Sequence, residues 1–273
     1  MKSLVVAALA AFLLLPVPAR AADDNVQSEL KSLVDTINAK LKGGEVTEQE
    51  LAPELKEFDA ILARHSEEKD DAAAQVLFMK AMLYVQVLND PEKSEKIFNE
   101  LQAKFPGTRA AAAAEEATGD LKRQEAAARI DAALKVGAPF PDFKEQDVNG
   151  APMSVSGLKG KVVLVDFWAT WCPPCVMELP SVRAAYEKYH DRGFDILGVS
   201  LDQDKATLVR FLKKNKVPWP QYFDGQGFDN KLAQKYGILV IPATFLLDRK
   251  GNILAKDLAG EELDEAVANA LGP

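Results

Sequence analysis

The sequence predicts two domains, an all-helical domain followed by an α/β domain. Between Asp23 and Lys135, apolar residues recur at helical intervals, and no strand-like run interrupts them. After Gly137, short apolar and β-branched runs alternate with helical segments, which is typical of a sheet covered by helices. Two cysteines at C-x-x-C spacing lie at one junction between such a run and a helix. The length of 273 residues also favours two domains over one.

The first 21 residues have the pattern of a secretory signal peptide. Met1-Lys-Ser is a short basic start, residues 4–15 form an apolar core, and Ala19-Arg-Ala21 is a small-x-small cleavage signature. The core is shorter than the roughly 20 residues of a membrane-spanning helix. We therefore expect cleavage after Ala21, export to a periplasmic or similar compartment where a disulfide persists, and no stable membrane insertion afterwards.

Residues 22–136 are expected to form the helical domain. Gly43-Gly44, Asn89-Asp90-Pro91 and Pro106-Gly107 are helix breakers, and the apolar stripes between them define the helices. The expected helices cover residues 26–41, 53–62, 71–88, 91–105 and 108–136. Most of the chain's excess negative charge also lies in this half.

The third and fourth of these helices weakly resemble one tetratricopeptide hairpin. Ser94, Phe98 and Pro106 have the spacing of its second helix. A repeat array needs about three copies, and the sequence has no second one. Two roles for this half therefore stay open, an acidic spacer or dimerisation domain and a docking module for a partner protein.

Residues 137–273 are expected to form the α/β domain. An Asn149-Gly150 turn between two short segments predicts a β-hairpin. Two buried strands and the helix between them then make a βαβ unit with parallel pairing. These three elements cover residues 162–168, 176–189 and 194–201. The elements after them are an inserted helix with a short extended piece, a helix ending at Gly237, two strands and a final helix: 205–216, 221–223, 244–248, 253–257 and from 261.

The C-x-x-C pair directly follows the first buried strand and opens a helix. Pro173 suits the first helical position because its missing N–H would have no partner there, which places Cys172 at the helix N-terminus. The free N–H groups and the helix dipole favour a thiolate and lower the pKa of Cys172 below the roughly 8.5 of a free cysteine. We therefore expect Cys172 to be the attacking sulfur and Cys175, one turn further in, to be the resolving thiol.

Asp166 is the single charged residue in the first buried strand. A carboxylate is costly to bury, so its pKa should be raised unless it is paired, and such a group can take the proton from Cys175. A structural pairing with a nearby lysine is the alternative. Glu178, one turn after Cys175, is expected on a solvated helix face, and a functional role is the alternative.

Several features in the second half form one specific set. They are the motif Trp168-Ala-Thr-Trp-Cys-Pro-Pro-Cys175, Asp166 six residues before the first cysteine, Pro180, and Ile241-Pro242-Ala243-Thr244. With them, residues from Gly137 onward resemble the thioredoxin superfamily and, within it, the TlpA/ResA-like periplasmic thiol-disulfide oxidoreductases. The resemblance implies a thioredoxin-like fold with an N-terminal β-hairpin and a central insert.

The resemblance also implies roles for individual residues. Cys172 and Cys175 would form a redox-active disulfide, and Asp166 would be the family's buried acid. Pro242 would follow a cis bond, so that the backbone of Ile241 faces Cys172 and pairs with an incoming peptide. Trp171, together with Trp168, would shield the sulfurs.

The predicted activity is thiol-disulfide exchange with protein substrates through a mixed disulfide. No cofactor is expected, and a zinc site is disfavoured because His65 and His190 are the only further candidate ligands of the usual kind. The formal net charge of −8 argues against nucleic acid as a partner. The resemblance implies a membrane electron-donor protein, a reducing role and apocytochrome c maturation as a substrate class.

Two other functions remain open from the sequence. A thiol peroxidase would share the broad fold, although the P-x-x-x-T-x-x-C signature of peroxiredoxins is absent. A binding or scaffold protein would use the helical half and carry an inert redox domain.

Overall fold

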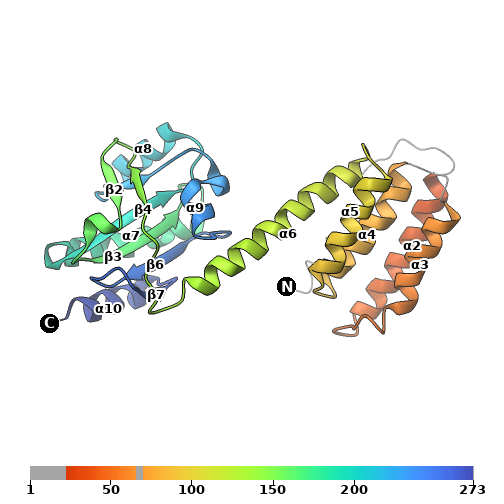
Figure 1. Cartoon of the computed structure of the whole chain (residues 1–273). Helices are drawn as coiled ribbons and strands as arrows, with labels where there is room; N and C mark the ends of the chain where they lie inside the picture. The colour runs from red at the N-terminus through yellow and green to blue at the C-terminus, as the bar shows by residue number, and fades with distance from the viewer. Residues whose placement is uncertain (1–22, 66–69, 273) are drawn as a thin grey trace. The chain divides into compact units, whose positions relative to one another are not determined.

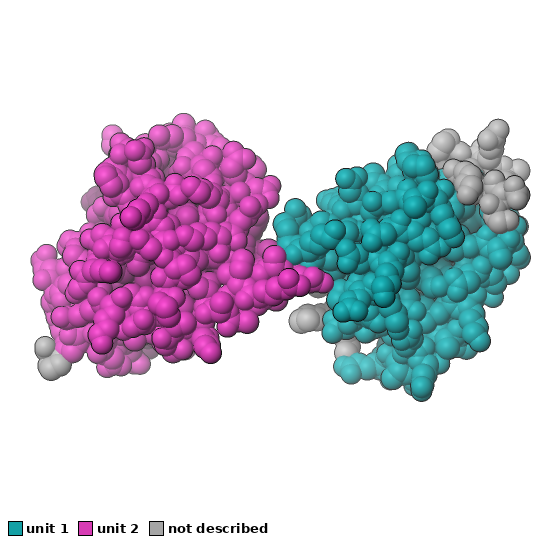
Figure 2. Space-filling view, viewed as in Figure 1, with its two compact units in different colours: residues 1–123 teal, residues 124–273 magenta. Residues whose placement is uncertain are grey.

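The computed structural model describes residues 23–65 and 70–272 (Figure 1). The predicted signal peptide lies outside these residues. The chain divides into two compact units, residues 1–123 and 124–273, which Figure 2 colours separately. The sequence placed the boundary at 136/137, whereas the division falls inside helix α6. The reason is that the end of α6 packs on the second unit, whose core includes Ile130 and Leu134.

The first unit is helical, as predicted. Its helices are α2 (Asp23–Leu41), α3 (Ala52–Arg64), α4 (Asp71–Gln86), α5 (Pro91–Lys104) and the first part of α6 (Arg109–Ala133). The Asp70 carboxylate caps α4 by accepting from the backbone N–H groups of Ala72 and Ala73. Helix α4 is central, since Met79 packs in the cluster shared with α2 and α3, and Phe78 packs in the cluster shared with α5 and α6.

The second unit contains the predicted α/β elements. A small antiparallel pair, β1 and β2, precedes a five-stranded sheet in the order β5-β4-β3-β6-β7. The central strand β3 pairs in parallel with β4 and antiparallel with β6. The elements are β1 (Lys144–Gln146), β2 (Pro152–Ser154), η1 (Ser156–Leu158), β3 (Val162–Trp168), α7 (Pro173–Tyr189), η2 (His190–Arg192), β4 (Phe194–Ser200), α8 (Lys205–Lys214), β5 (Gln221–Tyr222), η3 (Gly227–Asp229), α9 (Lys231–Lys235), β6 (Ala243–Leu247), β7 (Ile253–Lys256) and α10 (Gly260–Leu271).

Alternate residues of β3 face opposite sides of the sheet, as in any strand. Leu164 packs in a cluster with Leu179 of α7 and Leu263 of α10. Val165 packs on the other side, in a cluster that includes residues of α8 and α9. Asp166 is two residues from Leu164, so its side chain lies on the α7 side of the sheet.

No helix in residues 23–65 and 70–272 combines the length and the apolar composition that a membrane crossing requires.

Candidate functional site

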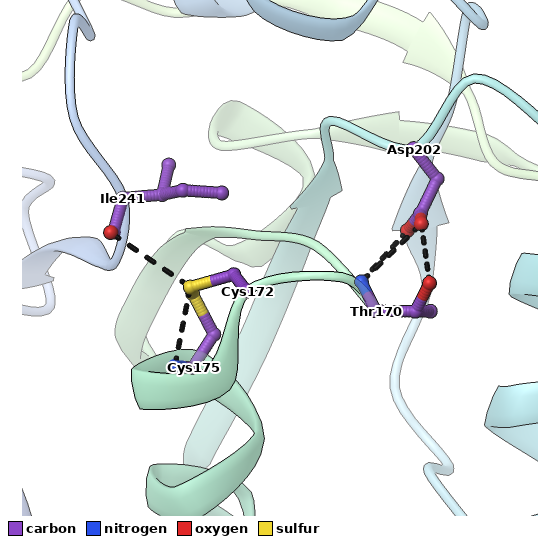
Figure 3. Close-up of a disulfide and its surroundings, with 5 residues drawn as sticks. All are labelled: Thr170, Cys172, Cys175, Asp202 and Ile241. Atoms are coloured by element: carbon purple, nitrogen blue, oxygen red, sulfur yellow. Dashed lines mark hydrogen bonds between the residues drawn. A yellow bond between two sulfur atoms is a disulfide. The ribbon is translucent and has the colours of Figure 1, made fainter.

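The two cysteines form a disulfide at the N-terminus of α7 (Figure 3). Their sulfur atoms are 2.02 Å apart and their Cα atoms 5.3 Å apart. Helix α7 begins at Pro173, so Cys172 is its N-cap residue, as the sequence predicted. The backbone N–H of Cys175 donates to the Sγ atom of Cys172 at 3.2 Å. In the reduced protein, this N–H and the helix dipole would favour a thiolate at Cys172.

The loop before β6 brings a backbone carbonyl group to the same sulfur. The Ile241–Pro242 peptide bond is cis, in agreement with the resemblance. The carbonyl oxygen of Ile241 lies 3.8 Å from the Sγ atom of Cys172 (Figure 3). A polypeptide that reaches this sulfur therefore also meets the backbone of Ile241.

Exposed apolar side chains lie on four segments of the second unit, and two of them, Trp171 and Val240, are next in sequence to Cys172 and Ile241. The indole of Trp171 is 51% exposed and its ring centroid is 6.0 Å from that of Phe228. Trp168, by contrast, is buried in the core. We call these side chains the apolar rim: Trp171, Met177, Phe228, Leu239 and Val240. Apolar patches of this kind mark sites where soluble proteins bind other proteins.

Asp166 is a buried carboxyl group in the middle of β3. Its side chain is on the α7 side of the sheet, and the residue is 8% exposed. Burial, together with the nearby negative charge of Glu178, raises the pKa of Asp166 to about 7. No ion pair joins Asp166 to a lysine or arginine among the described residues, so the alternative of a lysine partner finds no support there. A carboxyl group with this pKa can accept and release a proton near neutral pH.

Glu178 is half-buried on α7, and burial raises its pKa. The solvated helix face that the sequence predicted is therefore only partly exposed at this residue. The helix turns its side chain partly toward the sheet, where its charge acts on Asp166.

Asp202 holds the loop before the disulfide and was missed in the sequence. Its buried carboxylate accepts from the backbone N–H of Thr170 at 3.1 Å and from the Thr170 hydroxyl at 2.5 Å (Figure 3). The hydroxyl of Ser200 donates to the same carboxylate at 2.8 Å. The available signal was an aspartate directly after the second buried strand, where parallel strands present their carboxyl ends.

The family profile that matches this chain covers residues after the end of α6. The Redoxin family profile matches residues 135–271. The thiol-disulfide oxidoreductase ResA of Bacillus cereus (strain ZK / E33L) is 30% identical over 138 residues, which are 50% of this chain and 78% of that protein. ResA of Bacillus subtilis (strain 168) is 31% identical over 121 residues, 44% of this chain and 66% of that protein.

Solved structures match about half of the chain. The thioredoxin domain of a thiol-disulfide oxidoreductase from Bacteroides vulgatus is 32% identical, with a TM-score of 0.47, and the match covers 51% of this chain and 99% of that one. A thiol:disulfide interchange protein from Bacteroides sp. is 33% identical, with a TM-score of 0.45, and the match covers 50% of this chain and 89% of that one. On the family profile and the ResA relatives, the chain belongs to the Redoxin family of the thioredoxin superfamily and is a ResA/TlpA-like thiol-disulfide oxidoreductase.

Proposed function

We propose that this protein is an exported reductant of protein disulfides, with Cys172 as the attacking thiol and Cys175 as the resolving thiol. The observation that carries the proposal is the position of the Cys172 sulfur. It lies at a helix N-terminus, next to the Cys175 N–H, and 3.8 Å from the Ile241 carbonyl oxygen. The first two features favour a thiolate, and the third gives a peptide backbone a partner beside that thiolate.

In the first step the Cys172 thiolate attacks one sulfur of a substrate disulfide. A bond forms between Cys172 and that sulfur, the substrate S–S bond breaks, and the second substrate sulfur leaves as a thiolate. The carbonyl oxygen of Ile241 accepts a hydrogen bond from the substrate backbone, and the apolar rim covers substrate side chains. Trp171 is the rim residue next to the attacking sulfur.

In the second step Cys175 attacks the Cys172 sulfur of the mixed disulfide. The new Cys172–Cys175 bond replaces the bond to the substrate, whose first sulfur, the one attached to Cys172, leaves as a thiolate and takes up a proton. Cys175 must lose its own proton first, and Asp166 accepts it, since this buried carboxyl group lies in the strand that leads to the disulfide and has a pKa of about 7. Two electrons pass from the dithiol to the substrate, and the oxidised product is the disulfide present in the structure.

The helix start favours a reducing couple. Pro173 and Pro174 occupy the first two positions of α7 and have no N–H, so Cys175 provides the first backbone donor toward the Cys172 sulfur. A thiolate with fewer donors is less stabilised, which makes the dithiol form less stable and the couple more reducing. We therefore place its reduction potential nearer to that of thioredoxin, about −270 mV, than to that of the oxidant DsbA, about −120 mV.

A reductant outside the cytoplasm needs a source of electrons. The signal-like residues 1–21 support export, and a dithiol protein of the membrane would then return Cys172 and Cys175 to the reduced state. The resemblance to ResA/TlpA-like proteins favours apocytochrome c as the substrate class.

Trapping tests the assignment of the two cysteines. In a Cys175→Ala variant, substrates should remain attached to Cys172 as mixed disulfides, which mass spectrometry of the cell envelope identifies. A Cys172→Ala variant, which keeps Cys175, is the matched control and should trap none. The enzymatic assignment fails if the Cys175→Ala variant recovers no adducts and its Cys172 alkylates no faster than free cysteine at neutral pH.

Equilibration with glutathione redox buffers tests the direction of electron flow. The fluorescence of Trp168 and Trp171, which directly precede the disulfide in the sequence, reports the fraction reduced. A potential above about −170 mV would make the protein an oxidase or isomerase and would contradict the reducing role.

A further inference from the structure

Gln221 of β5 lies in register with Asp166 of β3, and strand β4 lies between them. Asp166 on β3 is paired with Gly198 on β4, and Gly198 is paired with Gln221. Side chains at paired positions of neighbouring strands point to the same face of a sheet. The Gln221 side chain is therefore on the α7 side of the sheet, together with Asp166.

The glycine between them leaves room for the Gln221 carboxamide. A Cβ atom at Gly198 would lie 2.2 Å from Oε1 and 2.4 Å from Nε2 of Gln221, closer than real contacts allow. The carboxamide thus occupies the space above Gly198, next to the position of Asp166. Any larger residue at 198 would displace it.

A hydrogen bond fixes which end of the carboxamide is free. The indole Nε1–H of Trp168 donates to Oε1 of Gln221 at 2.9 Å. Because an indole N–H can only donate, Oε1 must face Trp168, and Nε2 is left as the outer donor. Gln221 is 1% exposed, and its Nε2 has no hydrogen-bond partner among the described residues. A buried amide donor without a partner is costly. We therefore expect the Nε2–H group of Gln221 to gain a hydrogen-bond acceptor during the reaction.

We propose that Gln221 is a positioning residue for the resolving step, which directs its Nε2–H group at the Asp166 carboxylate, directly or through one water molecule. This proposal rests on the proposed role of Asp166 as the acceptor of the Cys175 proton. The donor favours the ionised form of Asp166, which is the form that can take up that proton. Trp168 orients the carboxamide.

Few other charges act on this carboxylate. Glu178 on α7 faces Asp166 and opposes its ionisation. The residues paired with Asp166 on the neighbouring strands, Gly198 and Thr244, carry no charge. Gln221 therefore balances Glu178, and together they set the pH at which the resolving step becomes fast.

The pH dependence of resolution tests this role. Reduced enzyme is mixed with a peptide disulfide, and rapid acid quench with mass spectrometry counts mixed and internal disulfides between pH 5 and pH 9. Gln221→Leu keeps the volume and removes the donor, so the midpoint of the pH-rate profile should rise by about one unit. The rate at pH 7 should then fall about fivefold, because the ionised fraction of a group with a midpoint near 7 drops from about a half to about a tenth. Tyr222→Phe, on the same strand but facing the other side, is the control and should leave the midpoint in place.

A double-mutant cycle separates positioning from packing. If Gln221 acts through Asp166, then adding Gln221→Leu to Asp166→Asn should not slow resolution further. Equal slowing in both backgrounds, or an unmoved midpoint in Gln221→Leu, would overturn the proposal. Wild-type resolution in Asp166→Asn would instead overturn the proposed acid role, which is a distinct result.

A second variant keeps the test decisive if Gln221→Leu does not fold. Gln221→Glu retains an acceptor for the Trp168 indole and replaces the amide donor by a second acceptor. Its midpoint should rise at least as far as that of Gln221→Leu, because the new carboxylate also repels the charge of Asp166. An unchanged midpoint in a folded Gln221→Glu protein would contradict the proposal as well.

Discussion

Asp202 accepts hydrogen bonds from both hydrogen-bond donors of Thr170, two residues before the attacking cysteine. The backbone N–H and the hydroxyl lie 3.1 and 2.5 Å from its carboxylate oxygens. Asp202 is 2% exposed and follows the end of β4. The loop before Cys172 is therefore anchored to the end of this strand by buried hydrogen bonds. The position of the sulfur therefore depends on a residue thirty positions further along the chain.

Thr170→Val should destabilise the protein while keeping its shape. The substitution removes the hydroxyl donor and leaves part of the buried Asp202 carboxylate without a partner, so the free energy of unfolding should fall by about 1–3 kcal/mol. Thr170→Ser, which keeps the hydroxyl, should stay close to wild type. Urea unfolding measures both, and an equal loss in the two variants would mean that the threonine methyl group is the stabilising part.

Asp166→Asn should slow the resolving step and spare the first step. The amide keeps the shape of the carboxyl group but cannot take the proton of Cys175, so the mixed disulfide should form at the normal rate and resolve about 10- to 100-fold more slowly above neutral pH. Quenched-flow kinetics with a peptide disulfide measure both rates. Asp229→Asn, at an exposed carboxylate on η3, is the control. A resolution rate unchanged from pH 6 to pH 9 would leave Asp166 with a structural role.

The same burial should make stability depend on pH. Asp166 has a pKa of about 7 in the folded protein, above the roughly 4 of an unfolded aspartate, so the folded state holds this proton more tightly. The contribution of this proton to the free energy of unfolding is greatest below about pH 4 and is lost as the pH rises to about 7. Asp166→Asn should therefore stabilise the oxidised protein by up to about 4 kcal/mol at pH 8, and very little at pH 4. Chemical denaturation at the two pH values tests this, and an equal change at both would contradict it.

Val240→Asp should weaken substrate binding without altering the cysteines. Val240 is 73% exposed beside Ile241, so a charge there disrupts only the apolar rim. We expect the KM for an unfolded protein disulfide to rise about tenfold, which corresponds to about 1.4 kcal/mol, with little change for a small disulfide. Val209→Asp, at an exposed position on α8, is the control. Equal KM values for the two variants would remove the rim from substrate binding.

The end of α6 should be required for a stable second unit. Leu134 is buried, and the backbone N–H of Gly137 donates to Ile253 at 2.8 Å, so this segment belongs to the α/β core. A fragment of residues 124–273 should keep exchange activity and should unfold at a higher temperature than one of residues 140–273. Within the full chain, Leu134→Ala should cost about 2–4 kcal/mol, and Val136→Ala, at an exposed position, less than about 0.5 kcal/mol. Fragments of equal stability would place the boundary where the sequence suggested.

Local patterns in the sequence were sufficient to predict the helices, the strands and the reactive pair of cysteines. A seven-residue apolar run, a C-x-x-C and a proline at the first helical position predict a cysteine at a helix N-terminus, because each signal acts over a few neighbouring residues. The helices of the first unit followed from their stripes and breakers for the same reason. The burial of Asp166 also followed, since the residues on both sides of it in the strand are all apolar and place the strand in the core.

Contacts between distant segments were decided only by the tertiary structure. No short-range pattern indicates that Asp202 binds Thr170, or that Gln221 fills the space above Gly198, because each pair is joined only when strands align side by side. The half-buried state of Glu178 depends likewise on how α7 is rotated against the sheet. Leu134 packs in the core of the second unit, and helical periodicity alone does not tell which core an apolar face meets. The residues and their local conformations are thus encoded along the chain, whereas the environment that sets their pKa values and positions arises only from packing in three dimensions.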